Sequence, residues 1–443
     1  MHHFRLYFML LIVLLIVVPA RAQEEATPVV EPSPASDAIP DAMPLVDEGT
    51  DDIVNILLIG AATRNPNNPG LTDSLMIVSA NRTAGTVSIV SIPRDLYVYE
   101  PDFGMYKINT AYFYGEENGV EGGGIGLLLR TIRYNLGLNI DFYARVDFTS
   151  FGKVINEVGG IDITVDCAIR DWRLKSPELD IHVADNYEIF TLTAGFYHMD
   201  ADTALWYVRS RKTSSDLDRG RRQQDVLRAL WRAIRAQGVL QNLPTLWGQV
   251  TDTVTTNLTL ADVVGMAPLA TTLNTSDIEY YTFRQKHEVT NAYSAAGQAI
   301  LMMDRDAVAA LMQNVVRPPS GSHANSARPK VEIVNASGVE YLDRVVADRL
   351  ELEGFDTEVV SEPANPRNYN HIIDYTGATK GNPIGTIQRV LSVTNEGVEV
   401  QPDPNRHYDF KVYVGALYLN WTCTRDVLQP DLTTPTPELT PGG

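Results

Sequence analysis

The stretch DFYARVDFTSFGKVINEVGGIDITVD, residues 141–166, decides the fold class. It begins with a strand pattern, continues with apolar residues at helical spacing, turns at Gly159-Gly160 and ends in a second strand pattern. Strands that alternate with helices in this way are typical of α/β domains. We therefore predict an α/β domain with a central β-sheet and helices on both of its faces.

Two strand patterns upstream end at residues that suit a ligand site. IVNILLIG, residues 53–60, is a short apolar run that ends at glycine and fits a buried strand. DSLMIVSANRTAGTVSIVSIPRDLYV, residues 73–98, predicts two strands around a turn at Ala84-Gly85, and the second strand ends at Pro93-Arg94-Asp95. Strand ends in such sheets commonly hold ligands. The glycine cluster at residues 122–126 predicts a loop that enters a helix, because no strand immediately precedes it.

The N-terminus has the pattern of a secretory signal. In MHHFRLYFMLLIVLLIVVPARAQEEA one arginine precedes an apolar run from Leu6 to Val18, and Ala20-Arg21-Ala22 matches a small-x-small cleavage site. The run is short for a membrane span, which needs about 20 residues. Cleavage after Ala22 is favoured, and an uncleaved signal anchor is the alternative. We expect an exported, extracytoplasmic protein at the cell wall or the membrane surface.

The length and the charge limit what the chain can be. With 443 residues it exceeds one average domain, and its net charge of −19 argues against general nucleic-acid binding. The expected organisation is a signal segment (1–22), a disordered linker (23–52), a catalytic domain (53–315), a linker (316–328), a small C-terminal α/β domain (329–420) and a disordered tail (421–443). Few contacts normally cross a linker rich in Pro, Ser and Gly, so we expect two separate folding units.

The cysteine count excludes a disulfide framework and a thiolate metal cluster, because Cys167 and Cys423 are the only cysteines. The two can pair in an exported protein or remain free thiols, and the sequence leaves both open. A Gly-x-Ser-x-Gly motif and paired ligands at zinc spacing are absent from the sequence, which argues against serine and zinc chemistry.

A cationic run, YVRSRKTSSDLDRGRRQQ (residues 207–224), stands out in this acidic chain. From Asp218 to Arg235 the apolar residues recur at helical intervals and predict an amphipathic helix. The polar residues in the sector of the apolar stripe are Arg219, Arg222 and Gln223. Those on the opposite, solvent side are Arg221, Asp225, Arg228 and Arg232, with Arg221 and Asp225 as a surface pair. Inward arginines at a helix start need an anion, and either a phosphate-type ligand or an internal carboxylate meets that need.

Five motifs stand in a recognisable order along the chain. They are SIPRDLYV, KINTAYFYG, VDFTSFGKVINEVGGIDITVD, ALWYVRSRK and DLDRGRRQQ. In order and spacing they resemble the LytR-CpsA-Psr (LCP) family of bacterial cell-wall enzymes, over about residues 53–285. Residues 329–420 are similar to the LytR-type C-terminal domain that often accompanies it, mainly through VEIVNASG.

The resemblance implies an LCP-type α/β fold and phosphotransfer outside the cytoplasm. Such enzymes move an anionic glycopolymer from a polyprenyl-pyrophosphate carrier to a peptidoglycan sugar hydroxyl and form a phosphodiester. The lipid tail lies in an apolar tunnel between the sheet and the helices, so the enzyme meets the membrane surface through its lipid substrate. Two alternatives stay open, a hydrolase that releases the polymer to water and a noncatalytic binder of lipid-linked polymer.

The resemblance also implies roles for single residues. The positions that match pyrophosphate-binding residues are Arg94, Lys107, Arg209, Arg211, Arg219, Arg222 and Gln223. The residues given a catalytic role are Asp73, Arg94, Arg209 and Arg219, because preset guanidiniums stabilise the charge on a leaving phosphate. Asp73 matches a metal-associated acid, Asp216 matches the acid that opens the last motif, and Asp95 is expected to orient Arg94.

Mg²⁺ is the cofactor that the resemblance implies, and two departures from the family pattern bear on it. Ala62 stands where the family usually has an acid, and Leu71 stands where it usually has an arginine. Mg²⁺ binds carboxylates, phosphate oxygens and water, so one missing carboxylate weakens its binding without abolishing it. We expect Mg²⁺ to bind appreciably only together with the pyrophosphate.

Overall fold

The structure of the protein is a computed structural model. It describes residues 37–63, 68–176, 178–212, 216–236, 247, 254–273, 277–317, 328–362, 364–378 and 381–418. The predicted signal segment, Cys423 and the C-terminal tail lie outside these residues. Among the helices that are described, none has the length and apolar character needed to cross a membrane.

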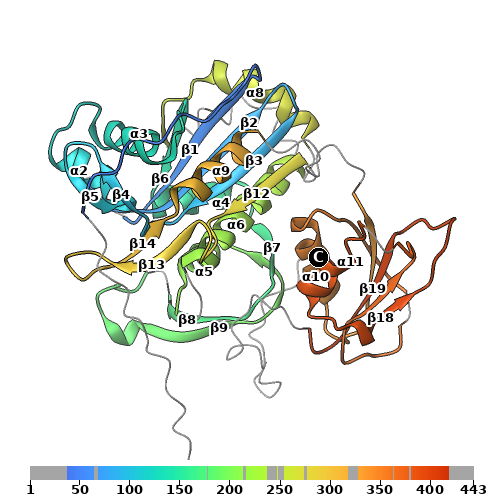
Figure 1. The fold of residues 1–443 in the computed structure, drawn as a ribbon. Helices are drawn as coiled ribbons and strands as arrows, with labels where there is room; N and C mark the ends of the chain where they lie inside the picture. Colours follow the sequence, from blue (N-terminus) through green and yellow to red (C-terminus); the bar gives the residue numbers. More distant parts are fainter. Residues whose placement is uncertain are drawn as a thin grey trace, which may run out of the picture.

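A six-stranded mixed sheet forms the centre of the larger domain (Figure 1). Its strands, in spatial order, are β11 (Thr255–Thr256), β6 (Phe142–Val146), β1 (Ile53–Ala61), β2 (Thr72–Asn81), β3 (Thr86–Ile92) and β12 (Ile278–Thr282). β2 pairs antiparallel with both neighbours, whereas the pairs β1–β6 and β3–β12 are parallel. The predicted turn between β2 and β3 is confirmed, with Gly85 at a φ of +73°.

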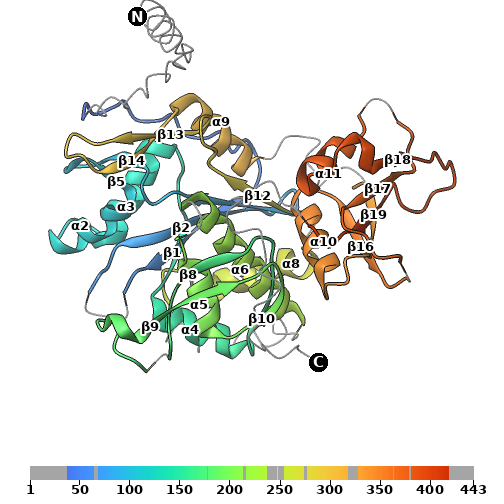
Figure 2. The ribbon, with the colours of Figure 1, turned by 90° about the horizontal axis from the view of Figure 1, so that it is seen from below.

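Helices cover both faces of this sheet, as predicted (Figures 1 and 2). On one face α3 (Gly123–Leu136) and α9 (Arg305–Val316) contribute to a core that includes Ile77 of β2 and Val90 of β3. On the other face α6 (Asp216–Ala236) and α8 (Leu260–Thr272) pack against Ala80 and Ile89. Ile89 and Val90 are neighbours in β3 and enter opposite cores, because successive strand residues point to opposite faces.

The stretch of residues 141–166 forms the elements that its pattern predicts. β6 is followed by α4 (Phe148–Glu157) and β7 (Ile161–Val165), and Asp147 caps α4 by accepting a 2.8 Å hydrogen bond from the Ser150 amide. Gly160 has a φ of +97°, and a side chain there would collide with the His198 ring. β7 pairs with β10 (Gly195–Met199) outside the central sheet. With α5 (Ala201–Arg209), these strands build a second core beside α6.

Besides β7 with β10, the described residues form three further two-stranded ribbons. They are β4 (Tyr97–Glu100) with β5 (Gly104–Lys107), β8 (Ile169–Leu174) with β9 (Tyr187–Leu192), and β13 (Val289–Tyr293) with β14 (Ala299–Met303). The first ribbon leads into α2 (Ala111–Glu117) and ends at Lys107.

Residues 37–52, which composition assigned to a disordered linker, pack against the larger domain. The Met43 amide donates a 2.8 Å hydrogen bond to the Tyr134 carbonyl, and the Val46 amide donates one of 2.9 Å to the Gly137 carbonyl. Met43 is also buried. A low apolar content therefore did not prevent this segment from docking on the end of α3.

The C-terminal unit is a small α/β domain with its own core, as predicted. Its sheet has the order β16 (Asp356–Val360), β15 (Lys330–Asn335), β19 (Phe410–Val414), β17 (His371–Asp374) and β18 (Val398–Val400). α10 (Leu342–Leu352) and α11 (Ile384–Leu391) complete it, and Figure 2 shows it beside the larger domain. Val331, Val346 and Phe410 are among the buried residues of its core.

Ion pairs join the two domains, so the expectation of few contacts across the linker is wrong. Asp348 of α10 accepts hydrogen bonds from the Nη2 atoms of Arg228 (2.6 Å) and Arg232 (2.7 Å), both on α6. Thr164 of β7 also donates to Asp348. Arg228, predicted on the solvent side, is only 3% exposed because the C-terminal domain covers it. Asp348 lies 120 residues further along the chain, beyond the reach of a helical-spacing argument.

Arg221 behaves as predicted in exposure but not in pairing. Its side chain is 40% exposed, and its Nη1 lies 3.5 Å from Asp218 Oδ1. The predicted pair with Asp225 is wrong, because Asp225 turns toward Arg228 instead, at 3.3 Å. Arg221 therefore serves below as an exposed control for the buried arginines of the same helix.

The buried carboxyl group of Glu100, at the end of β4, should make the free energy of unfolding depend on pH. It is fully buried, Thr110 donates a 2.7 Å hydrogen bond to its Oε1, and its Oε2 has no hydrogen-bond partner. Burial raises the pKa of Glu100 to about 8, and the Thr110 bond opposes this only in part. Because the folded pKa exceeds the unfolded one, the contribution of Glu100 to stability is fully present below about pH 4 and is lost as the pH rises through about 8.

We expect Glu100→Gln to remove that dependence and to be more stable than the wild type at pH 8, by on the order of 2 to 4 kcal/mol. Urea unfolding of both proteins at pH 5 and pH 8 measures it. The informative quantity is the wild-type minus variant difference, which cancels the other titrating groups. A difference that does not change with pH would contradict the assignment.

Candidate functional site

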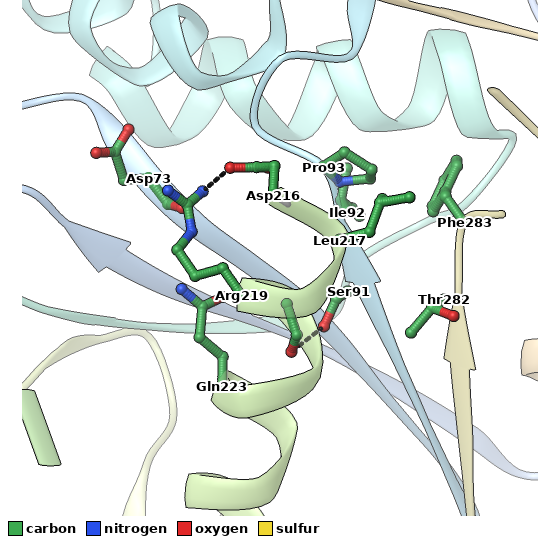
Figure 3. Close-up of a pocket in the computed structure, with 11 residues that line it drawn as sticks. Asp73, Ser91, Ile92, Pro93, Asp216, Leu217, Arg219, Gln223, Thr282 and Phe283 are labelled. Carbon is green, nitrogen blue, oxygen red and sulfur yellow. Dashed lines mark hydrogen bonds and ion pairs between the residues drawn. The ribbon is translucent and has the colours of Figure 1, made fainter. Parts of the chain in front are cut away.

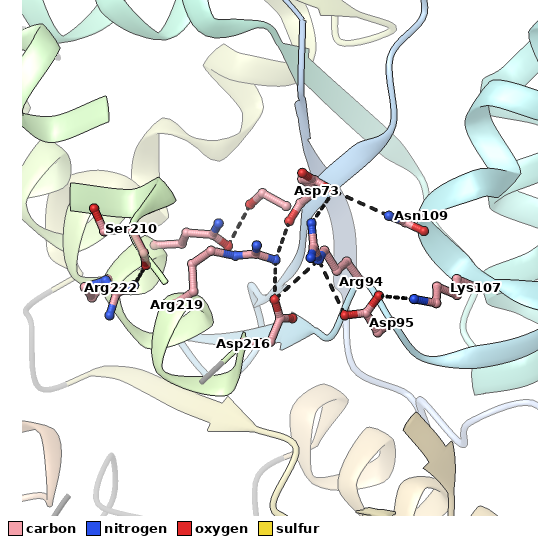
Figure 4. Close-up of polar contacts among 11 residues, drawn as sticks. Asp73, Arg94, Asp95, Lys107, Asn109, Ser210, Asp216, Arg219 and Arg222 are labelled. Atoms are coloured by element: carbon pink, nitrogen blue, oxygen red, sulfur yellow. Dashed lines mark hydrogen bonds and ion pairs between the residues drawn. The ribbon is translucent and has the colours of Figure 1, made fainter. Parts of the chain in front are cut away.

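Several elements bring charged residues together at one end of the central sheet (Figure 4). Asp73 is the second residue of β2, Arg94 and Asp95 follow the end of β3, Lys107 ends β5, and Asp216 begins α6. Pro93 terminates β3 because it cannot donate to a ladder, and the turn after it aims Arg94 at the start of α6. An acid at the first position of α6 also suits the positive end of the helix.

Arg94 lies at the centre of this cluster. Its Nη1 donates to Asp73 Oδ1 at 3.0 Å, and its Nε lies 3.5 Å from Asp95 Oδ2 and 3.4 Å from Asp216 Oδ1. Burial lowers the pKa of Arg94, but the three carboxylates outweigh this and raise it. Lys107 Nζ donates to Asp95 Oδ1 at 2.8 Å, so Asp95 bridges two cations as an orienting residue would.

Arg219 extends the cluster from the first turn of α6. It is 5% exposed, and its Nη2 lies 2.7 Å from Asp216 Oδ1 and donates to the Asp73 carbonyl at 3.1 Å. Burial disfavours the charged form of both groups, so it lowers the pKa of Arg219 and raises the pKa of Asp216. Three buried atoms have no aligned hydrogen bond despite the short ion-pair distances. They are the Nε atoms of Arg94 and Arg219, and Oδ1 of Asp216. The guanidiniums thus retain donor capacity for an anion.

Two polar residues that motif reasoning did not single out also belong to the site. Asn109 Nδ2 lies 3.4 Å from Asp73 Oδ1, and Ser74 donates to Gln223 Oε1 at 2.9 Å. Asn109 is the last residue of the KIN triplet that begins at Lys107, so the motif itself carried a signal for it. Ser74 follows Asp73 directly and fixes the predicted residue Gln223.

A narrow cavity of about 10 Å³ opens beside the cluster, between α6, β3 and β12 (Figure 3). Asp73, Asp216 and Arg219 line its polar part, and Leu217 and Phe283 are among its apolar lining. One water fills such a volume, so a polyprenyl chain does not fit it. This cavity therefore does not correspond to the lipid tunnel that the resemblance implies. Its lining nevertheless has a polar part and an apolar part, as the site of an amphiphilic ligand would.

The close approach of α6 to β3 keeps this cavity small. Ser91 Oγ donates to the Gly220 carbonyl at 3.2 Å, and a Cβ at Gly220 would lie 3.2 Å from the Ser91 Cβ. A Cβ at position 220 would therefore require Ser91 or the helix to shift by a few tenths of an ångström.

Of the predicted residues, Arg222 turns away from the cluster. Arg222 Nε donates to the Tyr207 carbonyl at 3.0 Å, and its Nη2 donates to the Ser210 carbonyl, so the side chain braces the end of α5. Arg209 is exposed and lies over the Phe148 ring at 4.3 Å. Arg211 is exposed as well. The predicted convergence with Arg94 is therefore wrong for Arg222, because a burial stripe does not specify which neighbour a residue faces.

Arg222→Ala should therefore affect stability and leave anion binding in place. We expect a loss of on the order of 2 to 4 kcal/mol, because two buried carbonyls would lose their donor and a cavity would form. Urea unfolding measures the first part, and titration with inorganic pyrophosphate under folding conditions measures the second. A large loss of pyrophosphate affinity in a fully folded Arg222→Ala protein would show that Arg222 does face the ligand.

The carboxylates of the cluster differ in their access to a metal ion. The side-chain exposures are 34% for Asp73, 25% for Asp95 and 19% for Asp216, so Asp73 is the most open. Within the described residues no group of three or more His, Cys, Asp or Glu is arranged to hold a metal ion. The Ala62 amide donates to the Leu71 carbonyl at 2.9 Å, which places both departures from the family pattern at the strand ends beside Asp73.

Two family models match the chain. The LytR_cpsA_psr family model covers residues 20–314, and a model described as LytR cell envelope-related transcriptional attenuator covers residues 328–418. The first match contains the whole charged cluster. The second coincides with the small C-terminal sheet and its two helices.

Curated relatives and solved structures are similar to parts of the chain. The polyisoprenyl-teichoic acid–peptidoglycan teichoic acid transferase TagT of Bacillus subtilis is 32% identical over 230 residues, or 50% of this chain and 65% of TagT. The regulatory protein MsrR of Staphylococcus aureus is 31% identical over 208 residues, or 46% of this chain and 56% of MsrR. The chain thus spans less than two thirds of the relatives it matches. The crystal structure of B. subtilis TagV matches at 23% identity with a TM-score of 0.48, covering 60% of this chain and 97% of that one.

Proposed function

Because the chain belongs to the LytR_cpsA_psr family, we propose that it transfers an anionic glycopolymer from a polyprenyl-pyrophosphate carrier to peptidoglycan. The observation that carries the proposal is the cluster of Arg94, Lys107 and Arg219 at one end of the central sheet. Three cations in one cluster match a ligand with an anionic head. The name of the relative TagT supports the same reaction class.

In the proposed reaction a peptidoglycan sugar hydroxyl attacks the phosphorus that carries the polymer. A new P–O bond forms, the bond to the bridging pyrophosphate oxygen breaks, and polyprenyl phosphate leaves with the electron pair. Arg94 and Arg219 lie where they can stabilise the charge on that leaving group. Their donors are preset by the strand end and by the first turn of α6, so little reorganisation is needed.

In the absence of substrate, the carboxylates around Arg94 pair with the cations of the cluster. Asp73, Asp95 and Asp216 neutralise the cations in the ligand-free protein. An incoming pyrophosphate competes for the same guanidinium donors, which are matched to phosphate geometry. The internal carboxylate and the phosphate ligand, which the sequence left as alternatives, then act in succession.

We also propose Mg²⁺ as a cofactor that binds together with the substrate. Asp73 has the most exposed carboxylate of the cluster and would hold the ion, with phosphate oxygens and water as the remaining ligands. The residues present fit such a shared site better than a protein-only cage, because Ala62 supplies no second carboxylate. When bound, the ion would neutralise charge on the phosphates.

The exported location is part of the proposal. The N-terminal apolar run and the Ala20-Arg21-Ala22 pattern support export, with signal cleavage or signal anchoring as the two routes. Peptidoglycan and the membrane surface are then the expected surroundings, and no nucleic-acid partner is proposed.

Release of polyprenyl phosphate from a polyprenyl-pyrophosphate-linked polymer, with and without peptidoglycan fragments, tests the proposal. We expect release that depends on the fragments. Equal release without the fragments would identify a hydrolase. Binding of the lipid-linked polymer without any release would identify a noncatalytic binder, the alternative that the missing acid at position 62 supports.

A further inference from the structure

A second cavity, of about 310 Å³, lies between the two domains. Asp225 and Arg228 of α6 line one wall, and Asp348 and Arg349 of α10 line the other. The narrow cavity of the charged cluster lies on the opposite side of α6, beside Arg219, Gly220 and Gln223. The two cavities thus share the helix but not the cluster.

Residues that line the interdomain cavity carry buried donors without partners. Arg228 is 3% exposed, and only its Nη2 is engaged, by Asp348 and Asp225, while its Nε and Nη1 have no hydrogen-bond partner. Arg349 is 8% exposed, and its Nε also has no partner. The Tyr280 hydroxyl, from β12, is the third such group. Buried polar groups in native proteins are nearly always hydrogen-bonded, so this wall calls for a ligand that supplies acceptors.

The charged residues that line the cavity indicate which kind of acceptor group would bind there. Arginines slightly outnumber carboxylates around the cavity. The five carboxylates there all lie within ion-pair distance of cations: Asp348 and Asp225 of Arg228, Asp166 of Arg349, Asp218 of Arg221, and Glu353 of Arg389. Arg389, 47% exposed, adds positive charge from the C-terminal domain. A compact oxyanion with several acceptor oxygens satisfies both the charge and the free donors.

We propose that the interdomain cavity is a second oxyanion site that binds a phosphate group through Arg228, Arg349 and Tyr280. The volume exceeds that of one phosphate and leaves room for the groups attached to a phosphodiester. The phosphate belongs either to a phosphodiester-linked glycopolymer chain or to free phosphate. The site itself is independent of the proposed transfer reaction, whereas the polymer as its source rests on that function.

Calorimetric titration of the whole chain with inorganic phosphate, and separately with a glycerol phosphate oligomer, tests this site. Arg219→Ala serves as the background because it disables the first site. In that background we expect one remaining site, weakened about tenfold by Tyr280→Phe and about tenfold by Arg349→Gln. Tyr280→Phe removes a single oxygen, so it leaves the domain contact through Asp348 intact. Tyr281→Phe, on the adjacent residue of β12, is the matched control and should bind as the background does.

Each outcome decides the proposal. Tighter binding of the oligomer than of phosphate assigns the site to the polymer, and the reverse assigns it to free phosphate. No binding of either compound in the Arg219→Ala background, or binding that Tyr280→Phe and Arg349→Gln leave unchanged, would overturn it. A failure of polymer transfer in the release assay would refute the proposed function and leave a measured phosphate site standing.

Discussion

Arg94→Ala is expected to lower polymer transfer about 10²- to 10³-fold, the range typical for removal of one preset donor to a developing oxyanion. The structure adds a second effect. Arg94 is the shared cation of Asp73, Asp95 and Asp216, so its loss leaves Asp73 without a cation and takes one of two cations from each of the others. We therefore expect a larger loss than for Arg219→Ala, which removes a partner from Asp216 alone.

The control for this prediction is Arg221→Ala, in the first turns of the same helix as Arg219. Its side chain is 40% exposed and pairs only with Asp218 at 3.5 Å, which is worth little. Initial rates of polyprenyl phosphate release from all three variants, with folding checked by circular dichroism, give the comparison. Similar rates for Arg94→Ala and Arg221→Ala would remove Arg94 from the centre of the site.

Asp73→Asn is expected to lower turnover at least about 10²-fold and to abolish its dependence on Mg²⁺. Binding of the pyrophosphate lipid should change little, because the change removes a negative charge and keeps both guanidiniums. Asp218→Asn, on the exposed side of α6, is the matched control and should behave as the wild type. Turnover in chelator and calorimetric titration of Mg²⁺, with and without a polyprenyl-pyrophosphate analogue, separate the two effects.

A second substitution, Ala62→Asp, tests the metal prediction by adding a carboxylate. Ala62→Asp places a carboxylate at the strand end beside Asp73, so it should raise the Mg²⁺ affinity of the ligand-free protein. Tight binding of Mg²⁺ to the ligand-free wild type would refute the shared site. Full turnover of the wild type in chelator would remove the need for the metal altogether.

Much of this architecture could be predicted from local patterns. The strand, helix, Gly-Gly turn and strand of residues 141–166 form as expected, because each element has its own period and its own cap or turn. The motifs likewise placed Arg94, Lys107, Arg219 and Gln223 near one another, since strand ends and a helix start meet at one edge of the sheet. In both cases the information lies within a short segment.

The failures have a common physical cause in long-range packing. Helical spacing placed Arg219 and Arg222 on one inward face, but the structure pairs the first with Asp216 and turns the second toward the carbonyls of α5. Arg228 was predicted in solvent because Asp348, its partner, belongs to another domain. A periodic pattern reports that a residue is buried, whereas its partner is set by tertiary contacts.

Mass spectrometry of the reaction product tests the central claim most directly. The wild-type protein would be incubated with a polyprenyl-pyrophosphate-linked glycopolymer and peptidoglycan fragments, and the products digested to the linkage unit. We expect a phosphodiester that joins the polymer to a peptidoglycan sugar, formed in equal amount to the released polyprenyl phosphate and at least about 10²-fold more slowly by Arg94→Ala. Free phosphorylated polymer in place of the phosphodiester, or a phosphodiester formed by Arg94→Ala at the wild-type rate, would contradict the proposed transfer.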